Sequence, residues 1–585
     1  MRITRRGWLG ATAALAGASA AEAVHAAPAP SAGTAPAAAP AAVAPLSRFL
    51  IRAPGAGHNY DDALTALADY ARAELAAWGL PGMTLSVTDA EGFVATLTLG
   101  WADRERGVPV GPRHLFQIGS ISKSFIALTV LALADQGRID LDAPLARYLP
   151  EAPLPPEPIT VAQLLSHTSG LADDPPEFPR TLDGRLWCGF APGSHFSYSN
   201  TGYRLLGRLI ERVSGEAHQS AVRRLVRDKL GLEGMAGVIS QGARGQFAVG
   251  YWPADHVAAA VLPGAPLEFA SWHEEDNPAG SLGGTGEQMA VYLRTLLRLG
   301  RGQGAPIVSD AAARRFAAAV IDTNEFGPGA RYACGVAVVP IDGAACLHHT
   351  GGMMAFSSSF HADPAAGVGG FASVNARNEG YRPRQTTAYA VRLMRAVRAG
   401  KPLPTAPDPL ASYRFMGASP LLGTFVSAAG EAVTLAARGD SVRVIARGGD
   451  FRALPQGPAR LITDHPGLSR FGLDAVMEDG NAVGFWWGET LFSRAAARPQ
   501  PVPAERLRPM AGVYLNRDPW VGGATVLVRG DTLVVEGRGP IVDRGGWWSG
   551  EKDPGGVERL RFDGHLNGKA QRLNASGQDL LRITV

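Results

Sequence analysis

The sequence predicts an α+β protein in which an antiparallel sheet flanked by helices, with a helical subdomain, is followed by all-β, barrel-like domains. Up to about residue 400, predicted strands at both ends of the region enclose a mostly helical middle, which is typical of a sheet with helices on its faces. A Pro-rich boundary follows, and beyond it short alternating strands are separated by Gly-rich turns. A chain of 585 residues has room for about three or four domains.

The composition is that of a soluble, multi-domain globular protein. The 56 Lys and Arg residues nearly balance the 53 Asp and Glu residues, so the chain has no basic footprint for nucleic acid. Hydrophobic residues make up 46% of the chain, which excludes a disordered protein and allows large buried cores. With 3 cysteines and no CxxC or Cys/His cluster, we expect neither a disulfide scaffold nor a zinc site.

The first residues have the layout of an export signal. The pair Arg5-Arg6 precedes an alanine-rich run, and Val24-His25-Ala26 places small residues where a signal peptidase cleaves. We therefore expect residues 1–26 to be a twin-arginine-type signal peptide and residues 27–45 an Ala/Pro linker. The mature protein would be periplasmic or secreted, and the alternatives are an uncleaved anchor or a chance pair of arginines. No other segment approaches the roughly 20 apolar residues that span a bilayer.

Residues 46–399 are expected to form the first folded domain. Its early part contains an amphipathic helix over Tyr60–Trp78. Alternation of apolar and polar residues over Met83–Val87 and Phe93–Leu99 predicts a hairpin. The segment Ser120–Gln136 is apolar on nearly every side, which predicts a buried helix that ends before a glycine.

The rest of this domain returns from helices to strands. From about residue 159 to residue 299 the chain is helical and rich in loops, and Thr285-Gly286-Glu287-Gln288 is a capping box that opens a helix. Predicted strands and one closing helix follow: Tyr332–Val339, Ala345–His349, Phe356–His361, Val368–Asn375 and the helix Thr386–Ala399.

Two all-β units are predicted after a linker at residues 400–412. The linker is rich in Pro and short of apolar residues. Beyond it, Leu421–Val426 resembles Met510–Leu515, so the region repeats itself. We therefore predict one β-barrel-like unit over residues 413–500 and a second over residues 501–585.

The motif that carries chemistry lies at the start of the predicted buried helix, where Ser120 and Lys123 form an S-x-x-K pattern. Residues three apart lie on one helix face, so the lysine amine can reach the serine hydroxyl. Serine is a poor nucleophile until a neighbouring base takes its proton, and a desolvated lysine can do that. The helix N-terminus also favours developing negative charge and supplies N–H groups for an oxyanion. This arrangement suits acyl transfer.

A second S-x-x-K pattern, Ser549–Lys552, lies in a Gly-rich loop of the β region. Only the first pattern is followed by Tyr198-Ser199-Asn200 and then by His349-Thr350-Gly351 at the end of a predicted strand. The C-terminal pattern is not followed by a basic residue with Thr-Gly after it, which is the third element of the first set. We therefore interpret the first set as functional and the second as coincidence.

Five sequence blocks in order carry a family resemblance: Leu115–Lys123, Leu164–Leu171, Pro192–Tyr203, Pro278–Leu282 and His349–Gly352. They resemble the serine β-lactamase and penicillin-binding-protein superfamily, and specifically its branch of class C β-lactamases, DD-peptidases, D-aminopeptidases and related esterases (peptidase family S12). The resemblance covers roughly residues 60 to 398. It implies a β-lactamase/transpeptidase-like fold and no metal or organic cofactor.

The resemblance also implies catalytic roles. Ser120 would be the acylated nucleophile, Lys123 its activating partner and Tyr198 a second proton carrier. The backbone N–H groups of Ser120 and Gly352 would form the oxyanion hole. Because a phenol with a pKa near 10 is a poor base at neutral pH, the role of Tyr198 requires Lys123 nearby to lower its pKa, or a proton shared between them.

Asn200, His349 and Thr350 would bind the substrate. Relatives usually have lysine where this sequence has His349. A histidine, with a pKa near 6.5, is mostly neutral at pH 7, so its pull on a substrate carboxylate is weaker. This departure resembles D-aminopeptidases and esterases and disfavours β-lactam hydrolysis and carboxypeptidase action. The C-terminal β units agree, since D-aminopeptidase-like members carry barrels there.

The expected function is a serine hydrolase that acts through a Ser120 acyl-enzyme on a small peptide, amide or ester. We prefer a D-aminopeptidase-like or modified-peptide peptidase. One alternative is an esterase or a weak β-lactamase or DD-peptidase of the same fold. Another is an inactive relative that binds peptidoglycan fragments, although decay would be expected to remove at least one catalytic residue and all are present.

Four further side chains are interpreted as structural. His348 alternates to the strand face opposite His349. His167 is expected to hold a turn by hydrogen bonding. Cys334 and Cys346 lie on neighbouring predicted strands, where a disulfide and two buried thiols are equally compatible with the sequence.

Overall fold

The protein is seen in a computed structural model that describes residues 46–51, 57–254, 262–377, 381–413, 421–439, 441–457, 459–494, 499–518, 521–553 and 555–584. The expected signal peptide (residues 1–26) and the Ala/Pro linker (residues 27–45) lie outside the described residues. Within them, no helix combines the length and apolar character needed to cross a membrane.

One antiparallel sheet organises the first domain, in the order β1-β3-β2-β14-β13-β12-β11-β10-β9, with β4 paired to β3. Strands from the two ends of the domain meet where β2 pairs with β14, with Met83 opposite Val374. This pairing confirms that the predicted hairpin and the later strands share one sheet. Its strands are β1 (Leu46–Ile51), β2 (Gly82–Asp89), β3 (Val94–Asp103), β4 (Val108–Pro109), β9 (Ile321–Asp322), β10 (Arg331–Tyr332), β11 (Ala337–Ile341), β12 (Ala344–Met353), β13 (Phe356–Asp363) and β14 (Val368–Val374).

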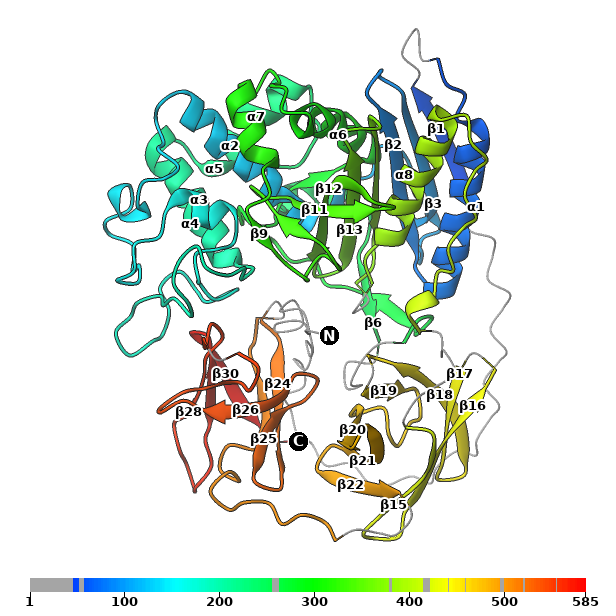
Figure 1. Cartoon of the computed structure of the whole chain (residues 1–585), viewed down its shortest axis with the longest axis vertical. Coiled ribbons are helices and arrows are strands. Elements are labelled where there is room, and N and C mark those ends of the chain that lie inside the picture. Colours follow the sequence, from blue (N-terminus) through cyan, green and yellow to red (C-terminus); the bar gives the residue numbers. More distant parts are fainter. Residues whose placement is uncertain are drawn as a thin grey trace.

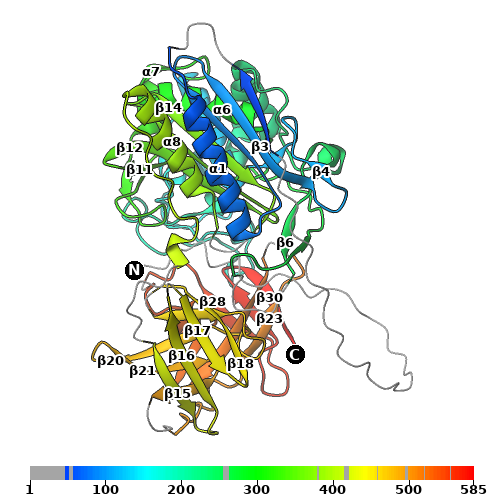
Figure 2. The same cartoon turned by 90° about the vertical axis from the view of Figure 1, so that its right-hand side faces the viewer.

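Helices cover both faces of this sheet. Helix α6 packs on β2, β3 and β14, whereas α8 packs on β13 and β14 with α1 beside it, as Figure 2 shows. The capping box predicted at Thr285 opens α6, because both of its hydrogen bonds are present. The helices are α1 (Asp61–Trp78), α2 (Ser122–Asp135), α3 (Val161–Leu165), α4 (Asn200–Ser214), α5 (His218–Val222), α6 (Gly286–Gly300), α7 (Asp310–Ala317) and α8 (Arg384–Arg398).

Alternating side chains of the central strands divide the domain into two hydrophobic cores. On β14, Phe371 points into the core that holds α2, α4, α6 and α7. Its neighbours Ala372 and Val374 belong to the core beneath α1 and α8. Successive residues of a strand face opposite sides, so one apolar strand serves both cores.

The buried helix that begins the motif differs slightly from its predicted bounds. Ser120 lies in a 3-10 turn, η2 (Gly119–Ile121), and α2 begins at Ser122. Nearly every side chain of α2 is buried, as its uniform apolar sequence predicts. Gly137 follows with a φ of 68°, a left-handed conformation that glycine adopts without strain.

Two closed antiparallel barrels follow, one from β15 to β22 and one from β23 to β30, which confirms the predicted all-β, barrel-like character. They lie side by side below the sheet domain in Figure 1. At their junction Arg460 pairs with Glu536 at 2.6 Å and Arg529 with Asp474 at 2.9 Å.

The strands of the first barrel are β15 (Gly423–Ser427), β16 (Ala432–Arg438), β17 (Ser441–Ala446), β18 (Gly449–Pro455), β19 (Arg460–Thr463), β20 (Leu473–Glu478), β21 (Asn481–Trp487) and β22 (Thr490–Arg494). Those of the second are β23 (Gly512–Leu515), β24 (Gly523–Arg529), β25 (Thr532–Val535), β26 (Gly539–Asp543), β27 (Trp548–Gly550), β28 (Leu560–Asp563), β29 (Arg572–Ala575) and β30 (Gln578–Ile583). Two small sheets of the first domain pair β5 (Phe116–Gln117) with β8 (Gly283–Gly284) and β6 (Tyr251–Pro253) with β7 (Leu267–Phe269).

Candidate active site

The turn that carries Ser120 is held against the end of β12 by close backbone contact. Gly119 has a φ of 55°, which favours glycine. A Cβ atom on Gly351 would lie 1.8 Å from the Ile118 carbonyl oxygen. Ser358 on β13 donates its hydroxyl hydrogen to that same oxygen at 2.7 Å. Glycines at these two positions therefore allow sheet and turn to touch, which fixes the location of Ser120.

The same contact brings Gly352 to the turn. A Cβ atom on Gly119 would lie 2.6 Å from the Gly352 backbone nitrogen. The Gly352 N–H thus lies against the residue that precedes Ser120. An oxyanion hole needs backbone donors fixed beside the nucleophile before the reaction begins, so this position is compatible with the predicted role of Gly352.

Lys123 makes three short contacts through its amine. Nζ lies 2.6 Å from Asn200 Oδ1, 2.8 Å from the Ala279 carbonyl oxygen and 3.1 Å from Ser120 Oγ. The side chain is completely buried. Because two of these partners can only accept, they take two hydrogens of the tetrahedral amine. Its remaining position faces the serine hydroxyl, where a neutral amine can accept the serine proton.

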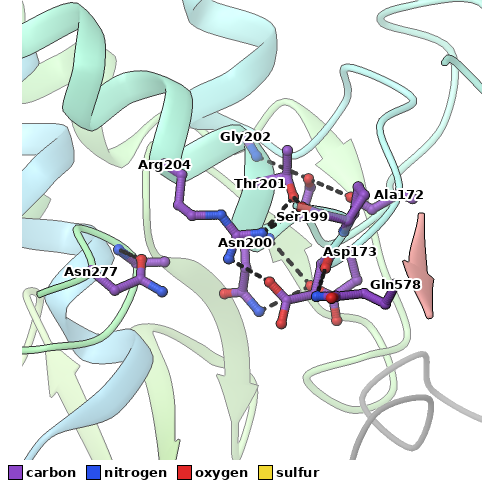
Figure 3. Close-up of polar contacts among 12 residues, drawn as sticks. Ala172, Asp173, Ser199, Asn200, Thr201, Gly202, Arg204, Asn277 and Gln578 are labelled. Atoms are coloured by element: carbon purple, nitrogen blue, oxygen red, sulfur yellow. Dashed lines mark hydrogen bonds and ion pairs between the residues drawn. The ribbon is translucent and has the colours of Figure 1, made fainter. Parts of the chain in front are cut away.

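Asn200 is oriented by Asp173. Asp173 Oδ1 accepts hydrogen bonds from the Asn200 backbone N–H at 3.2 Å and from the Asn200 side-chain amide at 3.1 Å, as Figure 3 shows. These contacts direct the amide nitrogen toward the carboxyl group and leave the amide oxygen for Lys123. Ser199 caps α4 by accepting from the Gly202 N–H at 3.0 Å.

The Asp173 carboxyl group lies in a buried acidic environment. Burial, followed by the nearby carboxyl groups of Asp174, Glu558 and Glu325, raises the pKa of Asp173 well above its ordinary range. Arg204 forms an ion pair with Asp174 at 2.5 Å. This ion pair offsets the charge of Asp174 and connects the acidic cluster to α4.

Tyr198 lies between Lys123 and His167. Lys123 Nζ is 4.9 Å from the centroid of the Tyr198 ring, and the His167 ring is 4.3 Å away. His167 has a φ of 56° and accepts the Ser199 backbone N–H at Nδ1 over 3.0 Å. The turn-holding role expected for His167 is therefore confirmed. The lysine amine lies over the Tyr198 ring, and the role of Tyr198 as a proton carrier stays a prediction.

His349 and Thr350 are fully buried in β12. His349 Nε2 lies 3.0 Å from the Tyr332 hydroxyl and Nδ1 lies 2.6 Å from the Thr350 carbonyl oxygen. A neutral imidazole can make both bonds by donating from Nδ1 and accepting at Nε2. Both ring nitrogens thus have partners within the protein, and contact of these two side chains with substrate stays a prediction.

Arg382 is a residue of this region that the sequence reasoning missed. A Cβ atom on Gly352 would lie 2.4 Å from Arg382 Nη2, so the guanidinium group lies against the strand end. Arg382 Nη1 donates to the Tyr381 carbonyl oxygen at 2.6 Å. The site therefore has a permanent positive charge despite the histidine at position 349. Arg382 belongs to none of the matching sequence blocks, which is why it was not anticipated.

The three cysteines and His348 are interpreted as structural. Cys188, Cys334 and Cys346 are unpaired thiols, which settles the alternative left open for the last two, and burial raises the pKa of each thiol to about 12. His348 stacks on His361, with ring centroids 4.0 Å apart, away from His349. Among the described residues, no three His, Cys, Asp or Glu side chains gather in a way that could hold a metal ion.

The second S-x-x-K pattern forms no comparable arrangement. Ser549 is fully buried in β27, where its hydroxyl donates to the Asp553 carbonyl oxygen at 3.2 Å. Lys552 is exposed. The interpretation of this pattern as coincidence is thus supported by its geometry.

Comparison with known proteins adds the family context. The family model "Beta-lactamase" matches residues 67–394. The chain is 34% identical over 184 residues to esterase EstB of Burkholderia gladioli, covering 26% of this chain and 45% of the relative. It is 33% identical over 167 residues to penicillin-binding protein 4 of Amycolatopsis lactamdurans, covering 26% and 44%. The chain thus spans less than half the length of these curated relatives.

Among solved structures, the fold is similar to the octameric penicillin-binding protein homologue from Pyrococcus abyssi. The TM-score is 0.53 at 22% identity, and the match covers 73% of this chain and 99% of that chain. At this identity the likeness concerns the fold.

Proposed function

The chain belongs to the beta-lactamase family of serine hydrolases, and from this premise we propose that it is an active hydrolase that forms an acyl-enzyme on Ser120. The observation that carries the proposal is the set of contacts around Lys123. Its amine lies 3.1 Å from Ser120 Oγ while Asn200 and Ala279 supply two acceptor oxygens. An inactive relative that only binds fragments would have no need of this arrangement.

In the proposed reaction Lys123 takes the hydroxyl proton as Ser120 Oγ bonds to the substrate carbonyl carbon. The resulting oxyanion accepts hydrogen bonds from the N–H groups of Ser120 and Gly352. When the intermediate collapses, the bond to the leaving amine or alcohol breaks, and that group takes the proton through Tyr198. A water molecule then attacks the acyl carbon and gives its proton to Tyr198. The bond to Ser120 Oγ breaks, the acid is released, and Lys123 returns a proton to the Ser120 oxygen.

For the substrate, we propose an amide or small peptide, of the kind that a D-aminopeptidase-like enzyme or a modified-peptide peptidase would use. The two C-terminal barrels support this choice, because D-aminopeptidase-like members of the family carry barrels there. The histidine at position 349 does not by itself argue against a β-lactam, because Arg382 gives the site a permanent positive charge. Ester hydrolysis is the second candidate, because the chain is similar to a protein named as an esterase. We also propose that the protein is exported through its twin-arginine-type signal, which replacement of Arg5 and Arg6 by lysine should block.

The nucleophile is tested by labelling with a fluorophosphonate probe. Wild type should be labelled and Ser120→Ala should not. Ser549→Ala is the matched control, because it removes the serine of the other S-x-x-K pattern, and it should be labelled like wild type. Equal labelling of wild type and Ser120→Ala would refute the assignment.

Substrate class is then tested with D- and L-aminoacyl amides, dipeptides, p-nitrophenyl esters and a chromogenic cephalosporin. Turnover of aminoacyl amides is expected. Turnover of the cephalosporin alone would refute the peptidase proposal, whereas turnover of esters alone would favour the second candidate.

A further inference from the structure

The second barrel packs on the loop that precedes α4 in the active-site domain, as the arrangement in Figure 1 shows. Trp187 on this loop donates its indole hydrogen to the Val557 carbonyl oxygen at 2.9 Å. A Cβ atom on Gly189 would lie 2.2 Å from a Val557 methyl group, so the two surfaces meet without room for a side chain. The Arg559 guanidinium lies 5.1 Å from the Trp187 ring and 4.7 Å from the Trp547 ring.

Within this interface Glu558 reaches the residue that orients Asn200. One carboxylate oxygen of Glu558 accepts the Asp173 backbone N–H at 2.8 Å. The other accepts the Ser576 hydroxyl hydrogen at 2.6 Å. Glu558 is 4% exposed, so these bonds are shielded from water. Because both oxygens of one carboxyl group are engaged, the second bond fixes the direction of the first.

A second contact holds the following residue of the same loop. The side-chain amide of Gln578 donates to the Asp174 carbonyl oxygen at 3.0 Å, and Figure 3 shows Gln578 beside Asp173. Two successive residues of the loop are therefore anchored to the second barrel, one through its N–H and one through its carbonyl group.

From Glu558 a continuous series of hydrogen bonds leads to the proposed catalytic lysine. Glu558 fixes the Asp173 backbone, the Asp173 carboxyl group binds both nitrogens of Asn200, and the Asn200 oxygen binds Lys123 at 2.6 Å. We propose that Glu558 is a positioning residue through which the second barrel completes the active site. The inference rests on the proposed function, because it assigns Glu558 to the same acylation reaction.

Glu558 would act by positioning and not by taking part in the reaction. It contacts the main chain of Asp173, whereas the groups proposed to react are Ser120, Lys123 and Tyr198. If the Asp173 loop moves, Asn200 loses the carboxyl group that orients its amide. The lysine then loses an aligned acceptor and with it a defined direction toward Ser120. A displacement of about 1 Å near a reacting group can lower a rate by about 100-fold.

The test uses the full-length protein and the limiting rate of Ser120 labelling at saturating fluorophosphonate. Glu558→Ala removes the acceptor, and Glu558→Asp keeps the carboxyl group but is one methylene shorter, which withdraws the acceptor from the Asp173 N–H. Both should lower the limiting rate by about 10- to 100-fold with little change in the probe concentration at half-maximal rate. Glu558→Gln keeps a side-chain oxygen at full length, so it should retain labelling within about threefold of wild type.

Arg180→Gln is the matched control. Arg180 lies on the same loop and forms an interdomain ion pair with Asp579 at 2.9 Å, but this pair does not involve Asp173. The control should label like wild type. An equal loss in Arg180→Gln, or unchanged labelling in folded Glu558→Ala and Glu558→Asp, would overturn the positioning role. If Glu558→Ala fails to fold, the contrast between Glu558→Asp and Glu558→Gln decides. Absence of Ser120 labelling in wild type would instead refute the proposed function and this inference with it.

Discussion

At the scale of single residues, the site combines a buried lysine, the proposed base, with an accessible serine, the proposed nucleophile. Lys123 is completely buried, whereas Ser120 is partly exposed. A buried amine is costly unless its hydrogens are satisfied, and the oxygens of Asn200 and Ala279 meet this need. The substrate therefore meets the serine oxygen first, with the lysine behind it.

Arg382 leads to a prediction about substrate charge. Its guanidinium lies against Gly352, so Arg382→Gln should raise KM for a carboxylate-bearing ester by about 10-fold, because a hydrogen bond to a charged group is worth about 1.5–3 kcal/mol. The KM of a matched neutral ester should change little. Arg392→Gln, which removes a surface ion pair with Asp342 at 2.8 Å, is the control. An equal rise in KM for both esters would show that Arg382 does not interact with the substrate charge.

At the scale of secondary-structure elements, α1 and α8 meet through a buried carboxyl group. Glu74 on α1 accepts a hydrogen bond from Thr386 on α8 and another from Tyr70 at 3.4 Å. Burial raises the pKa of Glu74 to about 7, although these hydrogen bonds oppose the shift. The helix pair therefore contains an ionisable group that titrates close to neutrality.

This titration predicts a pH-dependent stability. Between about pH 4.5 and pH 7 the folded protein holds a proton on Glu74 that the unfolded chain has released. Stability should thus fall as pH rises through this window, by on the order of 3 kcal/mol. In Glu74→Gln the melting temperature should depend less on pH over the same range. The exposed Glu287→Gln is the control, and a Glu74→Gln profile that parallels wild type would contradict the assignment.

The contact between β12 and the nucleophile turn gives a prediction at the same scale. A Cβ atom on Gly351 would lie 1.8 Å from the Ile118 carbonyl oxygen, so Gly351→Ala must push the strand from the turn. We expect a loss of about 1–3 kcal/mol of stability together with loss of Ser120 labelling. Gly245→Ala, where nothing lies within 4 Å of the added atom, should change neither melting temperature nor labelling. A fully labelled Gly351→Ala protein would show that the strand can move without affecting the turn.

The sequence predicted the parts of the site that depend on local spacing. Ser120 and Lys123 are three residues apart at a helix start, so their meeting follows from helix geometry. Asp173 and Glu558 were not anticipated, because their contact joins positions 385 residues apart. The Asp173-Asp174 pair after the Leu164–Leu171 block was the available signal for the first. Nothing in the local sequence marks Glu558, since its role comes from how two domains pack.

At the scale of the whole molecule, a small apolar cluster joins the domains. Ala172 and Trp187 of the sheet domain share this cluster with Val557 of the second barrel. Val557 is fully buried, although it lies outside the barrel's own core. Val557 is therefore buried by contact with the sheet domain and not by the barrel's own core.

Val557→Asp should separate the domains. It places a carboxylate in the shared cluster, where desolvation is unfavourable by several kcal/mol. We expect wild type to unfold in a single calorimetric transition. In the variant the melting temperature should fall by about 4 to 10 °C and the transition should split in two. Leu566→Asp, at a position 61% exposed on the same barrel, should do neither. One unchanged transition in Val557→Asp would mean that the domains are held together elsewhere.

Glu558 and Gln578 lie far along the sequence from the loop that they hold, and this affects when the site can form during synthesis. Asp173 is followed by Glu558 after 385 residues, and Asp174 by Gln578 after 404. At a synthesis rate of about 5–20 residues per second, the ribosome makes the loop about 20 to 80 s before its anchors. A nascent chain would thus contain the proposed nucleophile and the lysine well before the loop is anchored, so hydrolysis would reach its full rate only after the second barrel has emerged and docked.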